Sequence, residues 1–433
     1  MIKNYFKTAF RNLAKNKIFS LINIFGLAIG LACCLLIAVY VYDELSYDKY
    51  PEKAKQMYRV QVNVTGNGSV ETYPNVDIAV GEGMKNTFPE IQAYTRLLTS
   101  RETFVKYADK EFKEKKLAYT DSNFLQVFSI PLIEGDAKTA LSAPNSIVVT
   151  KALAEKYFDK EEALGKTLVL GATGYKVTGL IDKVPDNSHF HFDAFISMST
   201  RHLTAQTWSN IGFYTYLVLN KDADPKKLET KFPELVRKYV VPEVVHDMGV
   251  SLTEAQKSVN TFRFFLQPLT DIHLYSDTKY ELEANGDIKY VNIFSALAIF
   301  IMLLACVNFT NLSTASSAKR AREVGIRKVM GSEKKQLVVQ FLVESILLTY
   351  CAIVLSFLLL YFLLPYFNQL SGKQISFAFF FNYQSILAVS LLGLLVGTLA
   401  GIYPAFFISS FNTISILSKH HNRSKTLYAL PLL

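Results

Sequence analysis

Residues 20–42 are SLINIFGLAIGLACCLLIAVYVY, twenty-three residues without one charged side chain. A helix needs about 20 predominantly apolar residues to cross the hydrocarbon core of a bilayer. Three further runs of this kind lie at 291–312, 337–364 and 385–411, and Glu344 is the only acid in the four runs. The sequence therefore predicts a membrane protein with four transmembrane helices.

The overall composition agrees with a membrane protein and excludes other classes. Of the 433 residues, 50% are hydrophobic and 19% are charged, and the mean hydropathy is +0.19. Such a chain is too apolar to be disordered. The cysteines are too few for a disulfide scaffold. All of them lie in the apolar runs, at Cys33, Cys34, Cys306 and Cys351.

The charges of the remaining segments orient the chain. Residues 1–19 and 313–336 each carry a net charge of +5, and the tail 412–433 carries +3. Residues 365–384 hold a single lysine, and 43–290 has a net charge of −4. Basic residues gather on the cytoplasmic side of membrane proteins. Both termini and 313–336 are therefore predicted to be cytoplasmic, with 43–290 periplasmic and 365–384 a short outer loop. The total charge of +9 reflects this topology and does not indicate a nucleic-acid partner.

The first apolar run has a cleaved signal peptide as its alternative. The run continues to Tyr42, beyond the length of a signal-peptide core, and no convincing small-x-small cleavage site follows it. An uncleaved anchor is the favoured interpretation. In residues 1–19, apolar side chains share one helical face and basic side chains lie elsewhere, which predicts an amphipathic elbow helix on the cytoplasmic membrane surface.

The segment 43–290 alternates strand-like and helix-like patterns and is large enough to fold alone. This mixture predicts an α+β domain inserted between the first two spans. Asp224 and Pro225 supply an N-cap and a first-turn proline for a helix at 226–239. The other predicted elements are strands at 58–64, 146–150 and 214–219, a helix at 151–158, and a hairpin formed by 168–170 and 175–181.

Two motifs in this domain are similar to a nucleotide-binding and a metal-binding site, but simpler interpretations are favoured for both. Leu164-Gly165-Lys166-Thr167 is similar to the end of a phosphate-binding loop, but Lys160 stands where that motif requires glycine. A turn into a strand is favoured, and no nucleotide site or enzyme is predicted. His189, His191 and Asp193 would share a strand face and could form a metal cluster. A solvated strand face is favoured for them, so no metal is expected.

The spans carry small residues at helical spacing, which let helices approach closely in lipid. Gly26 and Gly30 are four residues apart, and Gly393, Gly397 and Gly401 repeat the same spacing. Packing within the chain and contact with a second subunit both remain open. A proton or ion path needs a cluster of polar or ionisable residues in the middle of the spans, and a single acid near the end of one span does not supply it. Ion-coupled transport is therefore disfavoured.

The loop 318–332, AKRAREVGIRKVMGS, is the most informative cytoplasmic segment. Glu323 and Arg327 are spaced to support a helix. Ile326 shares a face with Val329 and Met330, and Gly331 followed by Ser332 predicts a helix end and a new N-cap. A short amphipathic helix lying on the inner membrane surface is predicted. It would rest on anionic lipid or dock in the groove of a cytoplasmic partner.

At this loop the sequence resembles the permease subunits of MacB/FtsX-type ABC transporters, and similar segments follow in order along nearly the whole chain. The resemblance implies one span, a periplasmic domain of the MacB type, and three spans of an FtsX-like unit. The segments that carry it are 4–16, 23–27, 43–48, 57–60, 145–150, 154–158, 165–166, 177–179, 185–192, 271–274, 306–312, 322–331, 340–345 and 401–405.

The resemblance implies that the 320–331 helix couples the permease to a separate cytosolic ABC ATPase. ATP would act through that partner, with no cofactor bound by this chain. The implied coupling residues are Arg320, Arg322, Glu323, Gly325, Ile326, Arg327, Lys328 and Gly331. ATP-driven closure would be relayed to the periplasmic domain.

Two functions follow from the resemblance. The first is export of a peptide, lipid, lipoprotein or drug from the bacterial inner membrane, with a second permease copy or paralogue and an optional periplasmic adaptor. The second is an FtsX-like envelope regulator that controls a cell-wall hydrolase or a signalling partner. Relatives of this style often carry two such halves, and this sequence resembles the N-terminal half, so a dimer or a truncated product is expected.

Overall fold

The computed structural model describes residues 11, 17–66, 69–159, 161–203, 207–259 and 262–409. The chain divides into two units, one formed by Met1–Tyr42 with Lys289–Leu433 and the other by Asp43–Ile288. We call these the helical unit and the outer unit. Of the predicted elbow at 1–19, only Arg11 and residues 17–19 are described, and the tail 412–433 lies outside the described residues.

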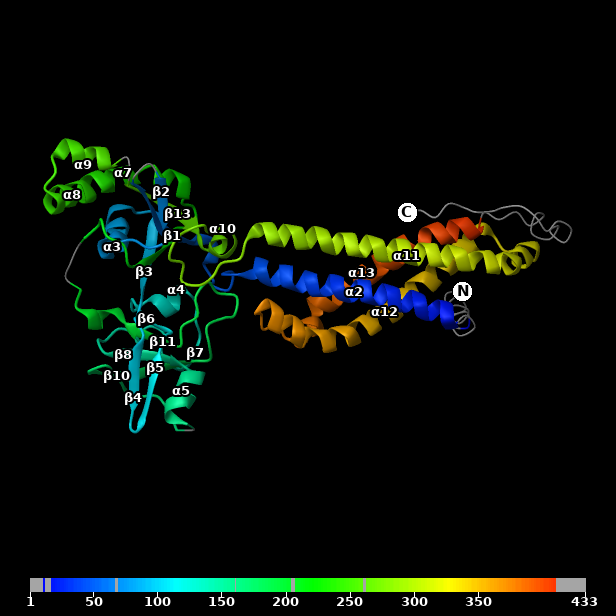
Figure 1. The fold of residues 1–433 in the computed structure, drawn as a ribbon, viewed down its shortest axis with the longest axis horizontal. Helices are drawn as coiled ribbons and strands as arrows, with labels where there is room; N and C mark the ends of the chain where they lie inside the picture. The colour runs from blue at the N-terminus through cyan, green and yellow to red at the C-terminus, as the bar shows by residue number, and fades with distance from the viewer. Residues whose placement is uncertain are drawn as a thin grey trace. The chain divides into compact units, whose positions relative to one another are not determined.

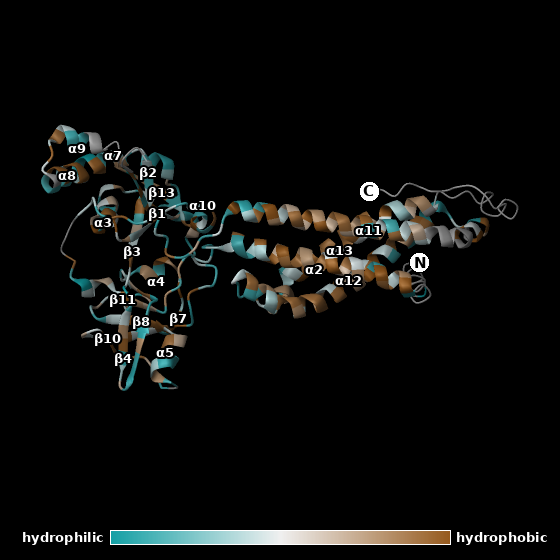
Figure 2. Ribbon diagram, viewed as in Figure 1, coloured by the Kyte–Doolittle hydropathy of each residue, from teal (hydrophilic) through white to brown (hydrophobic). Residues whose placement is uncertain are grey.

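The helical unit is built from long apolar helices. They are α2 (Lys17–Ser46), α11 (Ile288–Val329), α12 (Lys334–Ser371) and α13 (Tyr383–Ser409), with the short η5 (Phe377–Phe381) between the last two. Within the described residues, these four are the helices long and apolar enough to cross a membrane. Figure 2 shows them predominantly brown. The fold class predicted for this part of the chain is confirmed.

Two helix boundaries differ from the sequence-based expectation. The second span and the predicted coupling helix form one unbroken helix, α11, instead of a span, a loop and a separate short helix. Its residues 313–329 contain no proline or glycine pair to end it, and Gly325 alone is too weak a breaker. The outer loop is also shorter than predicted, because α12 continues to Ser371 and stops at Gly372, whose φ is +69°.

The outer unit contains a mixed sheet of thirteen strands within its described residues (Figure 1). The strand order is β13-β1-β12-β3-β6-β11-β8-β10-β9-β4-β5, with β2 beside β1 and β7 beside β10. Two pairings are parallel, β10 with β8 and β11 with β6, and the rest are antiparallel. The strands are β1 (Met57–Gly66), β2 (Ser69–Tyr73), β3 (Ile91–Thr99), β4 (Thr103–Tyr107), β5 (Lys110–Glu114), β6 (Leu117–Thr120), β7 (Leu132–Gly135), β8 (Ser146–Thr150), β9 (Thr167–Leu170), β10 (Thr173–Ile181), β11 (Ala194–Ser197), β12 (Tyr214–Leu219) and β13 (Phe262–Pro268).

Short helices cover this sheet. The α-helices are α3 (Ile78–Thr87), α4 (Phe124–Val127), α5 (Lys151–Phe158), α6 (Pro225–Glu229), α7 (Phe232–Leu235), α8 (Val241–Met248), α9 (Leu252–Val259) and α10 (Ile272–Tyr275). The remaining turns are the 3₁₀-helices η1 (Ala54–Gln56), η2 (Met198–Arg201) and η4 (Leu269–Asp271) and the π-helix η3 (Val236–Val240).

The strongest sequence patterns of the outer unit are confirmed. Every residue of β8 is buried, and Thr150 caps α5 by accepting a hydrogen bond from the backbone N–H of Leu153. The predicted hairpin is β9 paired with β10. Gly165 has a φ of +83° in the turn just before β9, so the motif that is similar to a phosphate-binding loop is a turn into a strand.

The predicted helix at 226–239 is broken. Asp224 caps α6 as expected, but α6 ends at Glu229 and a new helix, α7, starts at Phe232 with Pro233 in its first turn. Proline lacks the N–H that an interior helix position donates, so the helix restarts there. The chain then passes through the π-helix η3 into α8. The core behind these helices comprises residues of β1, β12 and β13, including Val60, Leu217 and Phe264.

Candidate functional site

The predicted coupling segment is the C-terminal end of α11. Val324 is buried against Leu337 and Phe341 at the start of α12, and Gly325 is buried beside it. Ile326 is 48% exposed, and Val329 and Met330 are more exposed still. The side chains of Arg320, Arg322, Glu323 and Arg327 lie outside those that the structure describes. The segment thus combines an inner face held on α12 with an exposed apolar face.

Lys328, one of the predicted coupling residues, makes a contact with α13 that the sequence does not predict. Its Nζ donates a 2.8 Å hydrogen bond to the backbone oxygen of Ser409, the last residue of α13. The final carbonyls of a helix have no partner within the helix and attract cations. Lys328 therefore caps α13 and ties the end of α11 to a second membrane helix.

The connection from α11 to α12 is a tight turn. Gly331 has a φ of +97°, a region that favours glycine, and its N–H donates to the oxygen of Lys328. This agrees with the predicted helix stop. The predicted N-cap at Ser332 is wrong, because Glu333 is the residue that precedes α12, and its side chain makes no capping hydrogen bond. The first turn of α12 is closed by a backbone hydrogen bond, in which the N–H of Gln336 donates to the oxygen of Glu333.

The predicted packing glycines all lie against a neighbouring helix of this chain. A Cβ added to Gly30 would lie 2.7 Å from the Cβ of Ala305 on α11, and one on Gly26 would lie 3.2 Å from Asn308. On α13, the same test brings Gly393, Gly397 and Gly401 within 2.6 to 2.8 Å of α12 atoms. Close helix approach within the chain accounts for this spacing.

Polar side chains are also buried between the helices. Glu344 and Ser345 on α12 are 6% and 7% exposed, and Ser345 lies against Gly401. Asn23 on α2 is 2% exposed, and neither atom of its amide has a hydrogen-bond partner among the described residues. Buried amides normally find partners, so Asn23 is a costly and specific feature of α2. The sequence pattern alone does not distinguish it from a lipid-facing residue.

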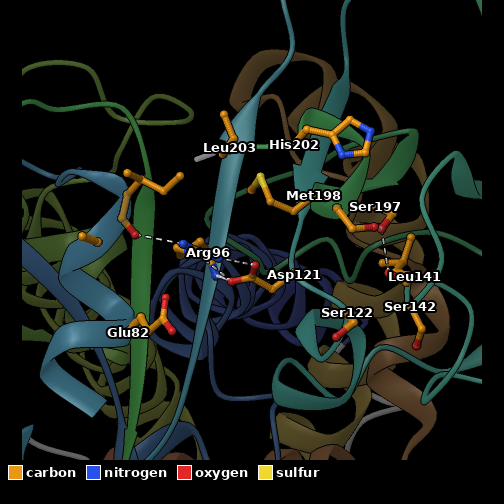
Figure 3. Close-up of a pocket in the computed structure, with 13 residues that line it drawn as sticks. Glu82, Arg96, Asp121, Ser122, Leu141, Ser142, Ser197, Met198, His202 and Leu203 are labelled. Atoms are coloured by element: carbon orange, nitrogen blue, oxygen red, sulfur yellow. Dashed lines mark hydrogen bonds and ion pairs between the residues drawn. The ribbon is translucent and has the colours of Figure 1, made fainter. Parts of the chain in front are cut away.

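The outer unit holds a polar pocket of about 640 Å³ between α3, the end of β3 and η2 (Figure 3). Arg96 forms a two-armed ion pair with Asp121 and also donates to the oxygen of Ile78. Burial opposes its charge, but Asp121 raises the pKa of Arg96 above its ordinary value. Asp121 neutralises Arg96, and the rest of the lining combines Glu82 and serine hydroxyls with apolar side chains such as Met198 and Leu203.

Of the predicted histidine motif, His189 is buried and His191 and Asp193 are half-buried, which corrects the expectation of a solvated strand face. His189 is 4% exposed and lies in a loop before β11. Its Nδ1 is 2.7 Å from Asp48 Oδ1 and its Nε2 is 2.7 Å from the hydroxyl of Tyr216. Alternation along a strand does not apply to a loop that folds back over the sheet. No cluster of metal-ligating side chains occurs in the part of the chain that the structure describes.

His191 takes part in a separate pair. Its Nδ1 is 2.8 Å from Glu283 Oε2, and its Nε2 is 3.1 Å from the oxygen of Pro185. Both partners are acceptors, and the ring can donate from both nitrogens only in its charged form. Burial disfavours that charge, but Glu283 outweighs it and raises the pKa of His191 above its ordinary value of 6.5. Asp193 does not join either pair, and burial raises its pKa.

Comparison with known families accounts for both units. The family model of the MacB-like periplasmic core domain matches residues 20–235, and that of the FtsX-like permease C-terminal region matches residues 295–413. The first match begins in α2 of the helical unit and covers most of the outer unit, and the second match lies within the helical unit. The chain belongs to the MacB/FtsX-type ABC transporter permeases.

Individual relatives of this MacB/FtsX-type permease are distant. The macrolide export ATP-binding/permease protein MacB of Pasteurella multocida is 21% identical over 430 residues, which is 96% of this chain and 60% of that protein. The protein of the same name from Campylobacter jejuni strain 81-176 is 25% identical over 171 residues, 39% of this chain and 26% of that protein. The chain thus spans between a quarter and about three fifths of the length of these relatives.

Solved structures also resemble the permease. A domain of a putative permease protein from Porphyromonas gingivalis is 17% identical, covers 56% of this chain and 98% of that domain, and has a TM-score of 0.43.

Several residues that organise the outer unit of this permease were missed by sequence reasoning. Arg59 on β1 is fully buried and forms an ion pair with Glu281, and His273 is hydrogen-bonded to Glu44. No periodicity marks a buried ion pair whose members are more than 200 residues apart. The available signal was that Arg59, Glu44 and His273 lie in short segments that resemble the family, namely 57–60, 43–48 and 271–274.

Proposed function

We propose that this permease works with a separate cytosolic ABC ATPase and relays the motion of that ATPase to its outer unit. Both termini and the 313–336 segment face the cytoplasm, and residues 43–290 are periplasmic in the bacterial inner membrane. A second permease copy or paralogue completes the assembly. The cargo is a peptide, lipid, lipoprotein or drug that is exported from the cell envelope.

The continuity of α11 is the observation that carries this proposal. This helix runs unbroken over 42 residues, from Ile288 to Val329. At about 1.5 Å per residue it is about 63 Å long, roughly twice the thickness of the hydrocarbon core. One rigid element therefore joins the boundary of the outer unit to the segment that would meet the ATPase. A hinge between span and coupling helix would absorb motion, and α11 has none.

The exposed surface of the coupling end supports a protein partner. Ile326, Val329 and Met330 expose apolar side chains at a helix end that also carries several basic residues. A helix with such a face docks into a groove of a partner. Val324 and Lys328 hold the opposite side of the segment on α12 and α13, so movement of a docked partner would reach three membrane helices.

Association with an ATPase is the decisive test. Tagged protein is purified gently from its native membranes, and copurifying ATPase and nucleotide turnover are measured. Gly325→Trp and Glu323→Lys are expected to reduce ATPase recovery at least tenfold while membrane insertion is retained. Lys151→Glu, an exposed charge reversal on α5 of the outer unit, is the matched control and should leave recovery unchanged.

Unchanged association and turnover in the Gly325 and Glu323 variants would remove the coupling assignment. Recovery of the ATPase together with a cell-wall hydrolase, and no transported substrate, would favour an envelope regulator over an exporter.

A further inference from the structure

Three segments far apart in the sequence meet in the outer unit. The incoming segment, residues 43–50, follows the first span, and the outgoing segment, residues 271–288, leads into α11. Between them lies the loop 185–192. Each contains a stretch that resembles the family, namely 43–48, 271–274 and 185–192. Their contacts are buried and polar, which is unusual for chain connections on a domain surface.

The incoming segment is fastened to β12 through the loop. The N–H of Asp48 donates to the oxygen of Asn187, and Asp48 Oδ1 accepts from both the backbone N–H and the ring of His189. The other ring nitrogen of His189 meets the hydroxyl of Tyr216 on β12. Burial raises the pKa of Tyr216 well above its ordinary value, so its O–H remains a donor. Asp48 Oδ1 can only accept, so His189 Nδ1 donates to it while the Tyr216 hydroxyl bonds to the opposite ring nitrogen, and together the two bonds fix one orientation of the ring.

The outgoing segment is fastened to the incoming one. His273 Nε2 is 3.0 Å from Glu44 Oε2, and the ring of Tyr47 stacks on His273 with centroids 3.5 Å apart. Gly286 passes directly over this pair. A Cβ at Gly286 would lie 2.5 Å from Glu44 Oε2 and 2.9 Å from His273 Nε2, so the absence of a side chain allows the outgoing chain to pass.

The outgoing segment is also fastened to β1. Both terminal nitrogens of Arg59 donate to the carboxylate of Glu281, at 2.6 and 2.7 Å, and Arg59 is fully buried. Arg59 and Tyr216 are direct cross-strand partners in the antiparallel pairing of β1 with β12. Directly opposite residues of two strands lie on the same face. The incoming and outgoing chains are thus tied to one cross-strand pair.

A simpler explanation of these contacts is that they give buried polar groups the hydrogen-bond partners that such groups need. It does not explain why the polar groups are there, because apolar residues of similar size generally stabilise a core at least as well as a buried ion pair. Buried polar networks impose one specific arrangement at that cost. Here the arrangement joins the two places where the chain enters and leaves the unit.

We propose that His189 and His273 are positioning residues that hold the incoming and outgoing segments against the Arg59–Tyr216 pair, so that displacement of either segment is transmitted to the other and to the sheet. This extends the relay and rests on the proposed function for its role in the cell. The mechanical link itself is a property of the outer unit.

Hydrogen exchange on the full-length permease in lipid nanodiscs, without ATPase or nucleotide, tests the link. Tyr216→Phe removes only the hydroxyl that holds His189, and Gly286→Ala displaces the Glu44 carboxylate from His273. Tyr157→Phe is the matched control, because Tyr157 is an equally buried tyrosine whose hydroxyl bonds to Val105 and Glu114 in another core.

The expected result is reciprocal. Tyr216→Phe should speed exchange about tenfold in peptides covering 43–50 and severalfold in peptides covering 270–277. Gly286→Ala should show the opposite order, with the same coupling factor between the two sites, because coupling free energies are reciprocal. Tyr157→Phe should change neither peptide.

Two outcomes would overturn the proposal. The first is that each variant loosens only its own segment, as a purely local packing role requires. The second is that the control loosens both segments equally, as general destabilisation requires. Since the measurement uses the permease alone, it is independent of whether an ATPase copurifies. Failure of the link and failure of the proposed function are therefore distinguishable.

Discussion

The hydrogen-bonded ion pair between His191 and Glu283 joins the loop 185–192 to the outgoing segment. Both side chains are partly exposed, at 28% and 37%. Burial opposes both charges, yet each group shifts the pKa of the other in the direction that favours the charged form, upward for His191 and downward for Glu283. This residue pair therefore makes the stability of the outer unit depend on pH.

The sign of that dependence follows from linkage. The contribution of His191 is complete below its unfolded pKa of 6.5 and is lost as the pH rises through its higher folded pKa. The contribution of Glu283 is complete above 4.5 and is lost as the pH falls through its lower folded pKa. We expect His191→Gln to destabilise the outer unit most between pH 4.5 and 6.5, with a smaller effect at about pH 9.

Urea unfolding followed by fluorescence measures this difference. Trp208 is the only tryptophan of the chain and is buried in the outer unit against Tyr239, so its emission reports on that unit. Lys183→Gln, which removes an exposed pair with Asp186, is the control and should give a small, flat difference. A difference for His191→Gln that does not vary with pH would contradict the assignment.

At the scale of elements, the glycines of α13 lie close to α12 for different reasons. A Cβ at Gly393 would meet the tip of the Ile353 side chain at 2.6 Å, whereas one at Gly397 would meet the backbone Cα of Ile346 at 2.8 Å. A side-chain tip moves aside by a rotamer change, but a helix backbone moves only if the whole helix shifts. The same four-residue spacing thus contains one tolerant and one intolerant position.

We expect Gly397→Ala to lower the thermal stability of the helical unit by several degrees and Gly393→Ala to lower it by much less. The measurement is the heating temperature at which the monodisperse peak is lost in size-exclusion chromatography in detergent. Leu395→Val, on the exposed and lipid-facing side of α13, serves as the control. Equal losses at the two glycines would show that α12 yields as easily as a side chain.

At the scale of the whole molecule, the two units share the continuous helix α11 and the helix α2. The apolar part of α11 that fits a membrane ends at Ser316, and the helix continues to Val329. The relay requires the helix between Ser316 and Gly325 to remain stiff. This stretch lies within the helical unit and joins the part of α11 that fits a membrane to the predicted coupling residues.

Ser316→Pro should interrupt the transmission of motion along α11 while leaving ATPase association and the fold of the outer unit intact. Proline in a helix interior removes one hydrogen bond, clashes with the preceding turn and costs about 3 kcal/mol. In complexes copurified with the ATPase, we expect the unaltered permease to show a nucleotide-dependent change in hydrogen exchange in the outer unit. We expect Ser316→Pro to retain association and turnover but to lose this change. Ser316→Ala is the control. A full response in the proline variant would show that α11 is not the path.

The sequence by itself determined the class of this protein and its larger divisions. Twenty-residue apolar runs have few stable solutions other than spanning helices, because lipid offers no partners for backbone groups. Local patterns were equally reliable where the signal was local, as in β8, in α5 with its cap at Thr150, and in the turn at Gly165. Such features depend on residues within a few positions of one another.

Only the tertiary structure decided how distant segments meet. It brought Asp48, His189 and Tyr216 together, buried Arg59 against Glu281, and placed Gly286 over the Glu44–His273 pair. It also joined the second span to the predicted coupling segment in one helix and placed Lys328 within hydrogen-bond distance of Ser409 on α13. Side-chain hydrogen bonds between segments that are distant in the sequence depend on chain topology, which has no period in the sequence. Residues that bind the two ends of a domain together are therefore visible only after the chain has folded.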